Sequence, residues 1–297
     1  MTATAVPATA ERFRLAEGPV WDAARRRLLW VDIPRGILLQ GRLDGGRIAV
    51  TGWHAFDGMV SAVAVGTDGA LLVAAQDRLI VLRPNGSRQE GPRIVPAGEC
   101  RRLNDGATDP AGRFLVGTLS LGGPSTRETL VRVEDDGRIT ELDCDLTLSN
   151  GLAWSADGKR MYSVDTLRRT VYVRDYDPAA GAVGTRSVHL RIEGGIPDGI
   201  ALDVADHLWV AVWEAGQLHR YAPDGSLADR VALPAPHTSN LAFAGDDLRT
   251  LVITTATAEL NAQQETAFPN SGRLFTLTVD VPGAPVPSWS GFRAVTT

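Results

Sequence analysis

The sequence predicts an all-β protein: a single six-bladed β-propeller domain over residues 1–297, with residues 1–12 as a flexible N-terminal extension. Three observations support this architecture. A loop rich in Asp, Gly and Ala followed by a short apolar run recurs six times, the copies are nearly evenly spaced, and sustained helical spacing of apolar residues is absent. The 31 glycines and 17 prolines would also interrupt helices often.

The six copies can be aligned on the first core residue of each apolar run. These anchors are Leu29, Leu71, Phe114, Met161, Leu208 and Leu251. They follow one another at intervals of roughly 40–50 residues, which is the length of one four-stranded propeller blade. About one further interval of chain follows the last anchor, so the sixth unit is complete. A β-sandwich or an open solenoid would not explain why the repeats stop at six when the chain is consumed.

Within each unit, short β-branched or aromatic runs alternate with turn residues, as consecutive antiparallel strands do. An open ring would expose strand edges, so we expect a strand from one chain end to complete a blade begun by the other. Either Arg12–Leu15 or Gly291–Val295 is the predicted closing strand. The turn-rich stretch from Pro282 to Pro287 is predicted to be a surface loop between strands.

The composition excludes several classes of partner. The net charge is −5, with 30 basic and 35 acidic residues, so no positive excess favours nucleic acid or an anionic membrane. The first ten residues lack the basic and apolar regions of a signal peptide, and no apolar stretch is long enough to span a membrane. Two cysteines are too few for a disulfide scaffold. We therefore expect a soluble cytoplasmic protein, and its oligomeric state is left open.

One register of the repeats is polar in all six copies. It lies about ten residues before each anchor, at the predicted start of the innermost strand. Its members are Glu17, Ser61, Asn104, Asn150, Asp198 and Ser239. Because equivalent positions of successive blades are related by rotation about the channel, these residues should form a ring.

Three members of this ring point to metal chemistry. Glu17, Asn150 and Asp198 supply two carboxylates and one amide oxygen. Two buried carboxylates would repel each other and raise their own pKa values, and a divalent cation removes that repulsion. The donors suit one Ca²⁺, Mg²⁺, Mn²⁺, Zn²⁺ or Fe²⁺ ion, and three protein ligands leave positions for water and substrate. The five histidines show no HxxH or HExxH spacing.

Four short motifs, in this order and at blade spacing, resemble the senescence marker protein/gluconolactonase/luciferin-regenerating enzyme family. They are Ala16–Asp22 (AEGPVWD), Arg102–Gly106 (RLNDG), Ser149–Ser155 (SNGLAWS) and Pro197–Gly199 (PDG). The resemblance runs from about Ala16 to Pro287 and implies a six-bladed propeller with one divalent cation on Glu17, Asn150 and Asp198. It also implies substrate contacts from Arg102 and Asn104, and a general base at Asp198. The chain departs from the family at Leu103 and in the loop Ser120–Pro124, which affects substrate choice more than the metal site.

The function expected from these observations is metal-dependent hydrolysis of a small sugar-acid lactone. Asp198 would activate the attacking water, and Arg102, Asn104 and Asp105 would hold the substrate. Two alternatives stay open: a hydrolase of the same fold acting on phosphotriesters or fluorophosphates, and a non-catalytic, calcium-binding regulatory propeller. The sequence does not indicate which lactone or metal is used, or whether loops 119–128 and 258–271 form a lid.

Overall fold

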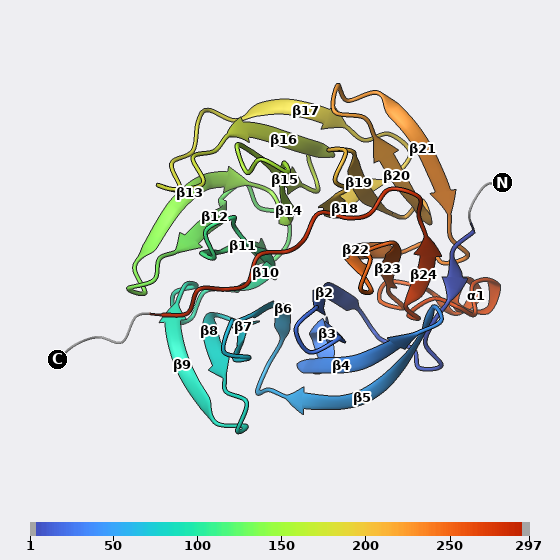
Figure 1. Cartoon of the computed structure of the whole chain (residues 1–297), viewed down its shortest axis with the longest axis horizontal. Coiled ribbons are helices and arrows are strands. Elements are labelled where there is room, and N and C mark those ends of the chain that lie inside the picture. The colour runs from blue at the N-terminus through green and yellow to red at the C-terminus, as the bar shows by residue number, and fades with distance from the viewer. Residues whose placement is uncertain (1–3, 293–297) are drawn as a thin grey trace.

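The computed structural model describes residues 4–292, and in it six four-stranded antiparallel sheets surround a central channel (Figure 1). The predicted six-bladed β-propeller is therefore confirmed. The innermost strand of each blade contacts the innermost strands of both neighbouring blades, so these six strands form a closed wall around the channel. None of the helices in the described chain has the length or hydropathy of a membrane span.

Blades one to three follow one another along the chain, and each runs from an inner to an outer strand. Blade one contains β2 (Ala16–Asp22), β3 (Arg27–Asp32), β4 (Ile37–Asp44) and β5 (Arg47–Ala55), with the 3-10 turn η1 (Ile33–Arg35) between β3 and β4. Blade two contains β6 (Val60–Val65), β7 (Leu71–Ala75), β8 (Arg78–Leu82) and β9 (Arg88–Arg93). Blade three contains β10 (Arg101–Thr108), β11 (Phe114–Ser120), β12 (Glu128–Val133) and β13 (Ile139–Leu146).

Blades four and five repeat the pattern, whereas blade six combines both ends of the chain. Blade four contains β14 (Ser149–Trp154), β15 (Arg160–Asp165), β16 (Thr170–Asp175) and β17 (Ser187–Arg191). Blade five contains β18 (Ile196–Leu202), β19 (Leu208–Trp213), β20 (Gln217–Tyr221) and β21 (Leu227–Ala232). Blade six contains β22 (Thr238–Ala244), β23 (Thr250–Thr255), β24 (Phe275–Thr278) and β1 (Val6–Pro7), with the helix α1 (Ala262–Ala267) between β23 and β24.

Burial explains which sequences form inner and outer strands. The inner strand β6 reads VSAVAV and is buried at every position, because it is covered by blades on both sides. The outer strand β5 alternates between exposed and more buried residues, as a strand with one solvated face does. Apolar clusters fill the spaces between neighbouring blades; one joins Leu72 and Val81 of blade two to Phe114 and Val131 of blade three.

The ring is closed by the N-terminal strand. Val6 pairs with Thr276 of β24, and the Ala8 amide donates to the Leu274 carbonyl oxygen at 2.8 Å. The expectation of a flexible extension over residues 1–12 is thus wrong for the described part of that segment. The N-terminal end does supply the closing strand, but Val6–Pro7 takes this place and Arg12–Leu15 does not. Of the alternative run Gly291–Val295, only residues 291 and 292 lie in the described part of the chain, and neither is in a strand.

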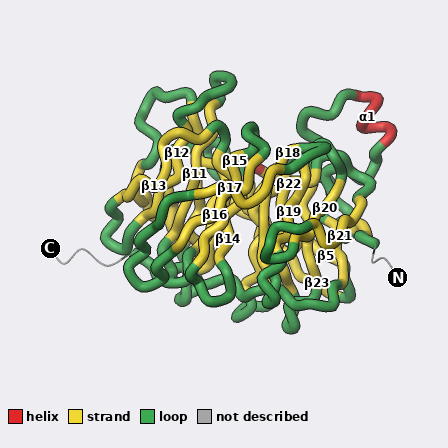
Figure 2. Tube along the Cα trace, turned by 90° about the horizontal axis from the view of Figure 1, so that it is seen from above, coloured by secondary structure: helices red, strands yellow, loops and turns green. Residues whose placement is uncertain are grey.

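The C-terminal segment crosses one mouth of the channel. We call residues 283–290 the strap. The mouth of the channel at which the inner strands end is called the strap face, and the opposite mouth is called the entry face. The Gly283 amide donates to the Leu248 carbonyl oxygen of blade six at 2.9 Å. The Trp289 amide donates to the Val65 carbonyl oxygen of blade two at 2.8 Å, so the two ends of the strap are held by different blades. The stretch Pro282–Pro287, predicted as a loop between strands, therefore belongs mostly to a bridge, and no strand follows it up to residue 292. Figure 1 shows it in red across the blades, and Figure 2 shows α1 projecting from the opposite face.

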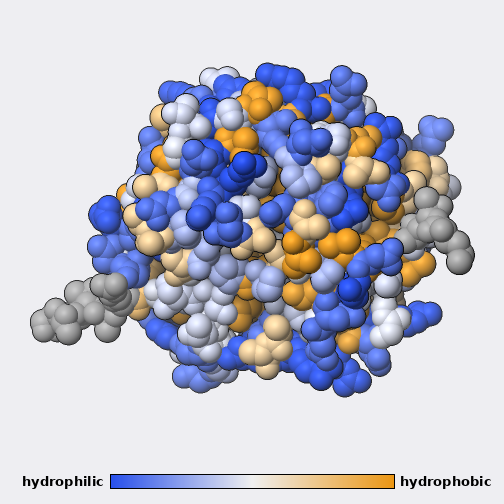
Figure 3. Space-filling model, turned by 45° about the horizontal axis from the view of Figure 1, so that its top comes forward, coloured by the Kyte–Doolittle hydropathy of each residue, from blue (hydrophilic) through white to orange (hydrophobic). Residues whose placement is uncertain are grey.

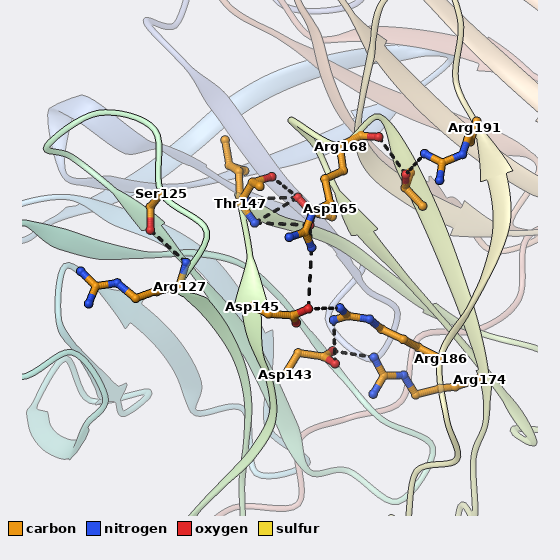
Figure 4. Close-up of polar contacts among 12 residues, drawn as sticks. Ser125, Arg127, Asp143, Asp145, Thr147, Asp165, Arg168, Arg174, Arg186 and Arg191 are labelled. Carbon is orange, nitrogen blue, oxygen red and sulfur yellow. Dashed lines mark hydrogen bonds and ion pairs between the residues drawn. The ribbon is translucent and has the colours of Figure 1, made fainter.

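Ion pairs connect blades three and four at their outer strands (Figure 4). Asp143 of β13 binds Arg174 of β16 at 2.5 Å and Arg186 at 2.9 Å. Arg186 also binds Asp145 at 2.5 Å. Because Asp143 and Arg174 are almost fully buried, each needs the other to balance its charge, and the network fixes the two blades side by side.

Candidate metal centre

Each inner strand contains one extra residue next to its ring position. In blade five, Pro197 pairs with Val212 and Ile200 pairs with Val210, so two residues of β18 stand opposite one residue of β19. The other five inner strands have the same irregularity at the equivalent place. A bulge of this kind redirects side chains, and here it brings the residues after two ring positions, Asp105 of β10 and Asn240 of β22, into contact beside Glu17.

Three of the six second positions, those directly after the ring residues, are glycines, and two of the three have no room for a Cβ. A Cβ at Gly151 would lie 2.7 Å from the backbone oxygen of Asp198, and a Cβ at Gly199 would lie 2.1 Å from the Asn240 side chain. The glycines thus let neighbouring inner strands approach closely. Asp105 and Asn240 are the two members of this second layer that carry polar side chains.

The two polar side chains of the second layer join the ring carboxylate of blade one. The Asn240 amide nitrogen donates to Glu17 Oε2 at 2.8 Å and to Asp105 Oδ2 at 3.1 Å. Three carboxyl groups therefore gather in the channel, those of Glu17, Asp105 and Asp198, and none is more than 9% exposed. Arg102 is the guanidinium that interacts electrostatically with this group.

Burial makes this concentration of charge unfavourable without a further cation. Desolvation and the Asp105 carboxylate raise the pKa of Glu17 to about 8, and desolvation raises the pKa of Asp105 to about 6. Desolvation, followed by the charges of Glu17 and Asp105, holds the pKa of Asp198 well above its usual range. Desolvation also lowers the pKa of Arg102 to about 10. One guanidinium does not balance three buried acids, so the cluster favours a bound divalent cation.

The three expected ligands each present an oxygen that is not bonded to any other group of the described chain. Asn150 Oδ1 and Asp198 Oδ1 are buried without a hydrogen-bond partner among residues 4–292. The Asn150 amide nitrogen is held by Thr166 Oγ1 at 3.1 Å, which directs the amide. The Gly18 amide at 2.9 Å and Asn240 both bond to Glu17 Oε2, which leaves Glu17 Oε1 available. Unpaired buried oxygens are costly, so the donor set fits a hard divalent cation.

The amide oxygen is essential to this assignment. Among residues 4–292, no group of three or more His, Cys, Asp or Glu side chains is arranged to hold a metal ion. The candidate centre therefore depends on Asn150 together with the two carboxylates, and the assignment of these three residues as metal ligands stays a prediction.

The six polar ring positions are not equivalent in the structure. Ser239 Oγ donates to the Ala16 carbonyl oxygen at 2.6 Å, and Ser61 Oγ lies 3.5 Å from the Ala74 carbonyl oxygen, so both hydroxyls bond to strand backbone. Asn240, which bridges two carboxylates, was not among the residues singled out from the sequence. An alignment of the repeats counts one polar ring residue per strand. In β10 and β22, the extra residue of the bulge supplies a second polar side chain, Asp105 or Asn240.

The predicted substrate residues separate into two groups. Arg102 Nη1 donates to Asn104 Oδ1 at 2.7 Å, and Asn104 Nδ2 donates to the Ser149 carbonyl oxygen at 2.8 Å. Asp105 instead bonds to Asn240 and faces the strap side, where it lines a cavity of about 600 Å³ between the strap and the ends of the inner strands. Figure 3 gives an oblique view in which apolar side chains gather near the middle of the molecule and hydrophilic ones surround them.

Comparison with known proteins agrees with the fold and the motif order. Residues 15–257 match the model of the SMP-30/gluconolactonase/LRE-like region, which is most of the chain. The chain belongs to this family. Among its relatives in the SMP-30/gluconolactonase/LRE-like family, pentonolactonase XacC of Haloferax volcanii is 37% identical over 295 residues, covering 96% of this chain and 97% of the relative.

Two further family relatives are similar over nearly their whole length. The 6-deoxy-6-sulfogluconolactonase of Pseudomonas putida is 34% identical over 290 residues, covering 93% of this chain and 95% of the relative. The crystal structure of a calcium-binding protein, regucalcin from Agrobacterium tumefaciens, superposes with a TM-score of 0.88 at 29% identity, covering 94% of this chain and 95% of that one.

Proposed function

We propose that the protein is a hydrolase that opens the ester ring of a sugar lactone with the help of one divalent cation. The observation that carries this proposal is the set of buried, unpaired oxygens of Asn150 and Asp198 beside Glu17. Relatives at 37% and 34% identity that are named as sugar lactonases support the substrate class.

Glu17, Asn150 and Asp198 would hold the cation. When bound, the ion supplies Lewis acidity that polarises the ester carbonyl and stabilises the negative charge that develops on its oxygen. The Asp198 carboxylate would accept a proton from a water molecule as that water attacks the acyl carbon. The bond from the acyl carbon to the ring oxygen then breaks, and the ring oxygen takes up a proton to give the open hydroxy acid.

Arg102 would orient the lactone from the entry side of the ring. Its Nη1 is held by Asn104 and by the Leu103 carbonyl oxygen, so its guanidinium has a fixed direction. The remaining donors suit a substrate oxygen or carboxylate. Asn104 uses both ends of its amide to fix Arg102 and the Ser149 backbone, so it would act as a positioning residue more than as a direct contact.

A panel of five- and six-membered lactones tests the proposal directly. Proton release from each would be followed with a pH indicator, using protein stripped of metal and protein reconstituted with Ca²⁺, Mg²⁺, Mn²⁺ or Zn²⁺. We expect hydrolysis only after reconstitution and a preference for hydroxylated lactones. Equal rates with stripped and reconstituted protein would refute metal dependence, and no hydrolysis of any lactone would refute the activity.

Replacing Arg102 with Ala is expected to lower kcat/KM for the preferred lactone about 10- to 100-fold while one metal ion per chain is retained. The physical reason is the loss of a directed cationic donor that is not itself a metal ligand. Arg101→Ala is the neighbouring control, because Arg101 bonds to Glu128 at 3.1 Å and to Thr118 at 2.8 Å and not to Asn104. Weaker metal binding by Arg102→Ala at normal kcat/KM would reverse the role assigned to this residue.

Replacing Asn240 with Ala is expected to weaken metal binding about 10- to 100-fold, as loss of a group that orients a ligand typically does. Without the bridging amide, Glu17 Oε2 and Asp105 Oδ2 lose a shared donor, and the ligand carboxylate is no longer held in one orientation. Titration calorimetry of the stripped protein measures the affinity. Asn85→Ala, in the exposed turn after β8, serves as the control. Unchanged affinity in the Asn240 variant would show that the bridge does not orient the ligand.

A further inference from the structure

A second polar residue occupies the same layer as Arg102 on the opposite side of the ring. The positions two residues before the ring form a layer at the start of the inner strands, and its members are Leu15, Met59, Arg102, Leu148, Ile196 and His237. Strand pairing supports their equivalence: Arg102 pairs with Leu119 of β11, and the Ala256 amide after β23 bonds to the His237 carbonyl oxygen at 3.0 Å. Arg102 and His237 belong to blades three and six, which stand opposite each other in a ring of six.

The imidazole of His237 is held rigidly. It stacks on the indole of Trp213 with ring centroids 4.1 Å apart and an interplanar angle of 7°. His237 Nδ1 lies 2.8 Å from the Ala258 carbonyl oxygen, and since a carbonyl oxygen only accepts, we assign the proton to Nδ1. In the neutral ring, Nε2 is then a hydrogen-bond acceptor in a fixed direction.

This acceptor is not used by the protein. His237 is 6% exposed, yet Nε2 has no partner among residues 4–292. His219 in β20 shows what a purely structural histidine does here: its Nδ1 bonds to Tyr221 Oη at 3.0 Å and its Nε2 bonds to Gln217 Oε1 at 2.8 Å. His237 satisfies one nitrogen and leaves the other without a protein partner among residues 4–292, at the face where the inner strands begin.

The opposite side of the same layer offers unused donors. Of the Arg102 nitrogens, Nη1 bonds to Asn104 and to the Leu103 carbonyl oxygen, whereas Nε and Nη2 have no hydrogen-bond partner in the described chain. The other four members of the layer are apolar. The entry face thus presents one donor group and one acceptor on opposite sides of an otherwise apolar ring, above the oxygens of Asn150 and Asp198.

We propose that His237 determines substrate specificity by accepting a hydrogen bond from a ring hydroxyl of the lactone through Nε2. This inference rests on the proposed lactonase function and deepens it. Arg102 donates to an oxygen at one edge of the substrate, and His237 binds a hydroxyl at the opposite edge. The substrate class is therefore a lactone hydroxylated on ring carbons away from the ester, since an unsubstituted lactone displaces solvent from this acceptor without pairing it.

The test compares two six-membered lactones that differ in their hydroxyl groups, glucono-1,5-lactone and δ-valerolactone. His237→Phe keeps an aromatic ring against Trp213 but removes the acceptor, and His237→Gln keeps an acceptor of different reach. For His237→Phe we expect kcat/KM to fall about 10- to 100-fold on gluconolactone. The factor by which kcat/KM falls on δ-valerolactone should be at least about tenfold smaller. His237→Gln should lie between wild type and the Phe variant. His189→Phe, in the outer strand β17, is the matched control.

Equal losses on both lactones, or no loss on either, would overturn the specificity role. Calorimetric binding of gluconate, the ring-opened acid, provides a readout that does not need turnover. If the wild-type protein opens neither lactone, the proposed function fails, and gluconate binding then decides the inference by itself. Weaker gluconate binding by His237→Phe at unchanged affinity for Ca²⁺ supports it, and equal gluconate binding refutes it.

Discussion

Replacing Asp198 with Asn should lower kcat for lactone hydrolysis by about 10²- to 10⁴-fold, which is the usual contribution of a positioned proton acceptor. The amide keeps the shape of the side chain and one oxygen for a cation but cannot take a proton from water. Steady-state kinetics on the preferred lactone measure the loss. A variant with the wild-type kcat would show that another group accepts the proton.

Asp198→Ala extends the test to metal binding. It removes the oxygen that lacks a protein partner, so elemental analysis of the isolated variant should show less than one metal ion per chain. The fold should persist. Because burial and two nearby carboxylates raise the pKa of Asp198, the metal-free protein loses stability as the pH rises above the ordinary carboxylate pKa, and the full penalty is present above the raised pKa. At neutral pH, the stripped variant should therefore unfold at the same temperature as wild type or higher. A lower unfolding temperature would contradict the electrostatic account.

Deleting residues 1–9 should lower the free energy of unfolding by about 3–5 kcal/mol, counting about 1 kcal/mol for each of several lost hydrogen bonds and adding the burial of Ala5 and Ala8. The segment bonds to two blades: Ala8 N to Leu274 O at 2.8 Å, and Ile48 N to Ala8 O at 2.9 Å. Its loss also exposes β24 as an edge strand, so the truncated chain should associate at high concentration. Urea unfolding and sedimentation velocity measure the two effects.

A graded control accompanies this deletion. Ala8→Pro removes only the amide that donates to Leu274 O, so it should lose about 1 kcal/mol and stay dispersed. Full stability after deletion of residues 1–9 would mean that the ring is held closed without β1.

The blade count and the ring were predictable because both depend on local pattern repeated at a fixed interval. Anchors such as Leu29 and Phe114 begin the second strand of a blade or lie within it, and both are fully buried. The closing strand was not predictable in the same way. Val6 and Pro7 have no distinctive pattern, and what selects them is the reach of the chain from β24 to the start of blade one.

The candidate site was predictable to the extent that it follows register. Glu17, Asn150 and Asp198 each begin a repeat and carry oxygen donors, and the structure gathers their carboxylates and amide with Arg102. Asn240 and His237 could not be found by this route. The position of Asn240 depends on a bulge in β22 that the alignment of the repeats does not show. The orientation of His237 depends on its stacking partner Trp213, which belongs to a different blade.

The position of β1 has a consequence for how the chain reaches its folded state. β1 is synthesised before every other strand of the ring, and its partner β24 is synthesised after all of them. Five blades can form in order during synthesis from local hairpins, whereas the sixth must wait for the two ends to meet. Closing so long a loop carries the largest entropic barrier in the fold. Ring closure should therefore be the final, slow event of folding, and until it occurs the protein has an unpaired strand edge that is prone to association.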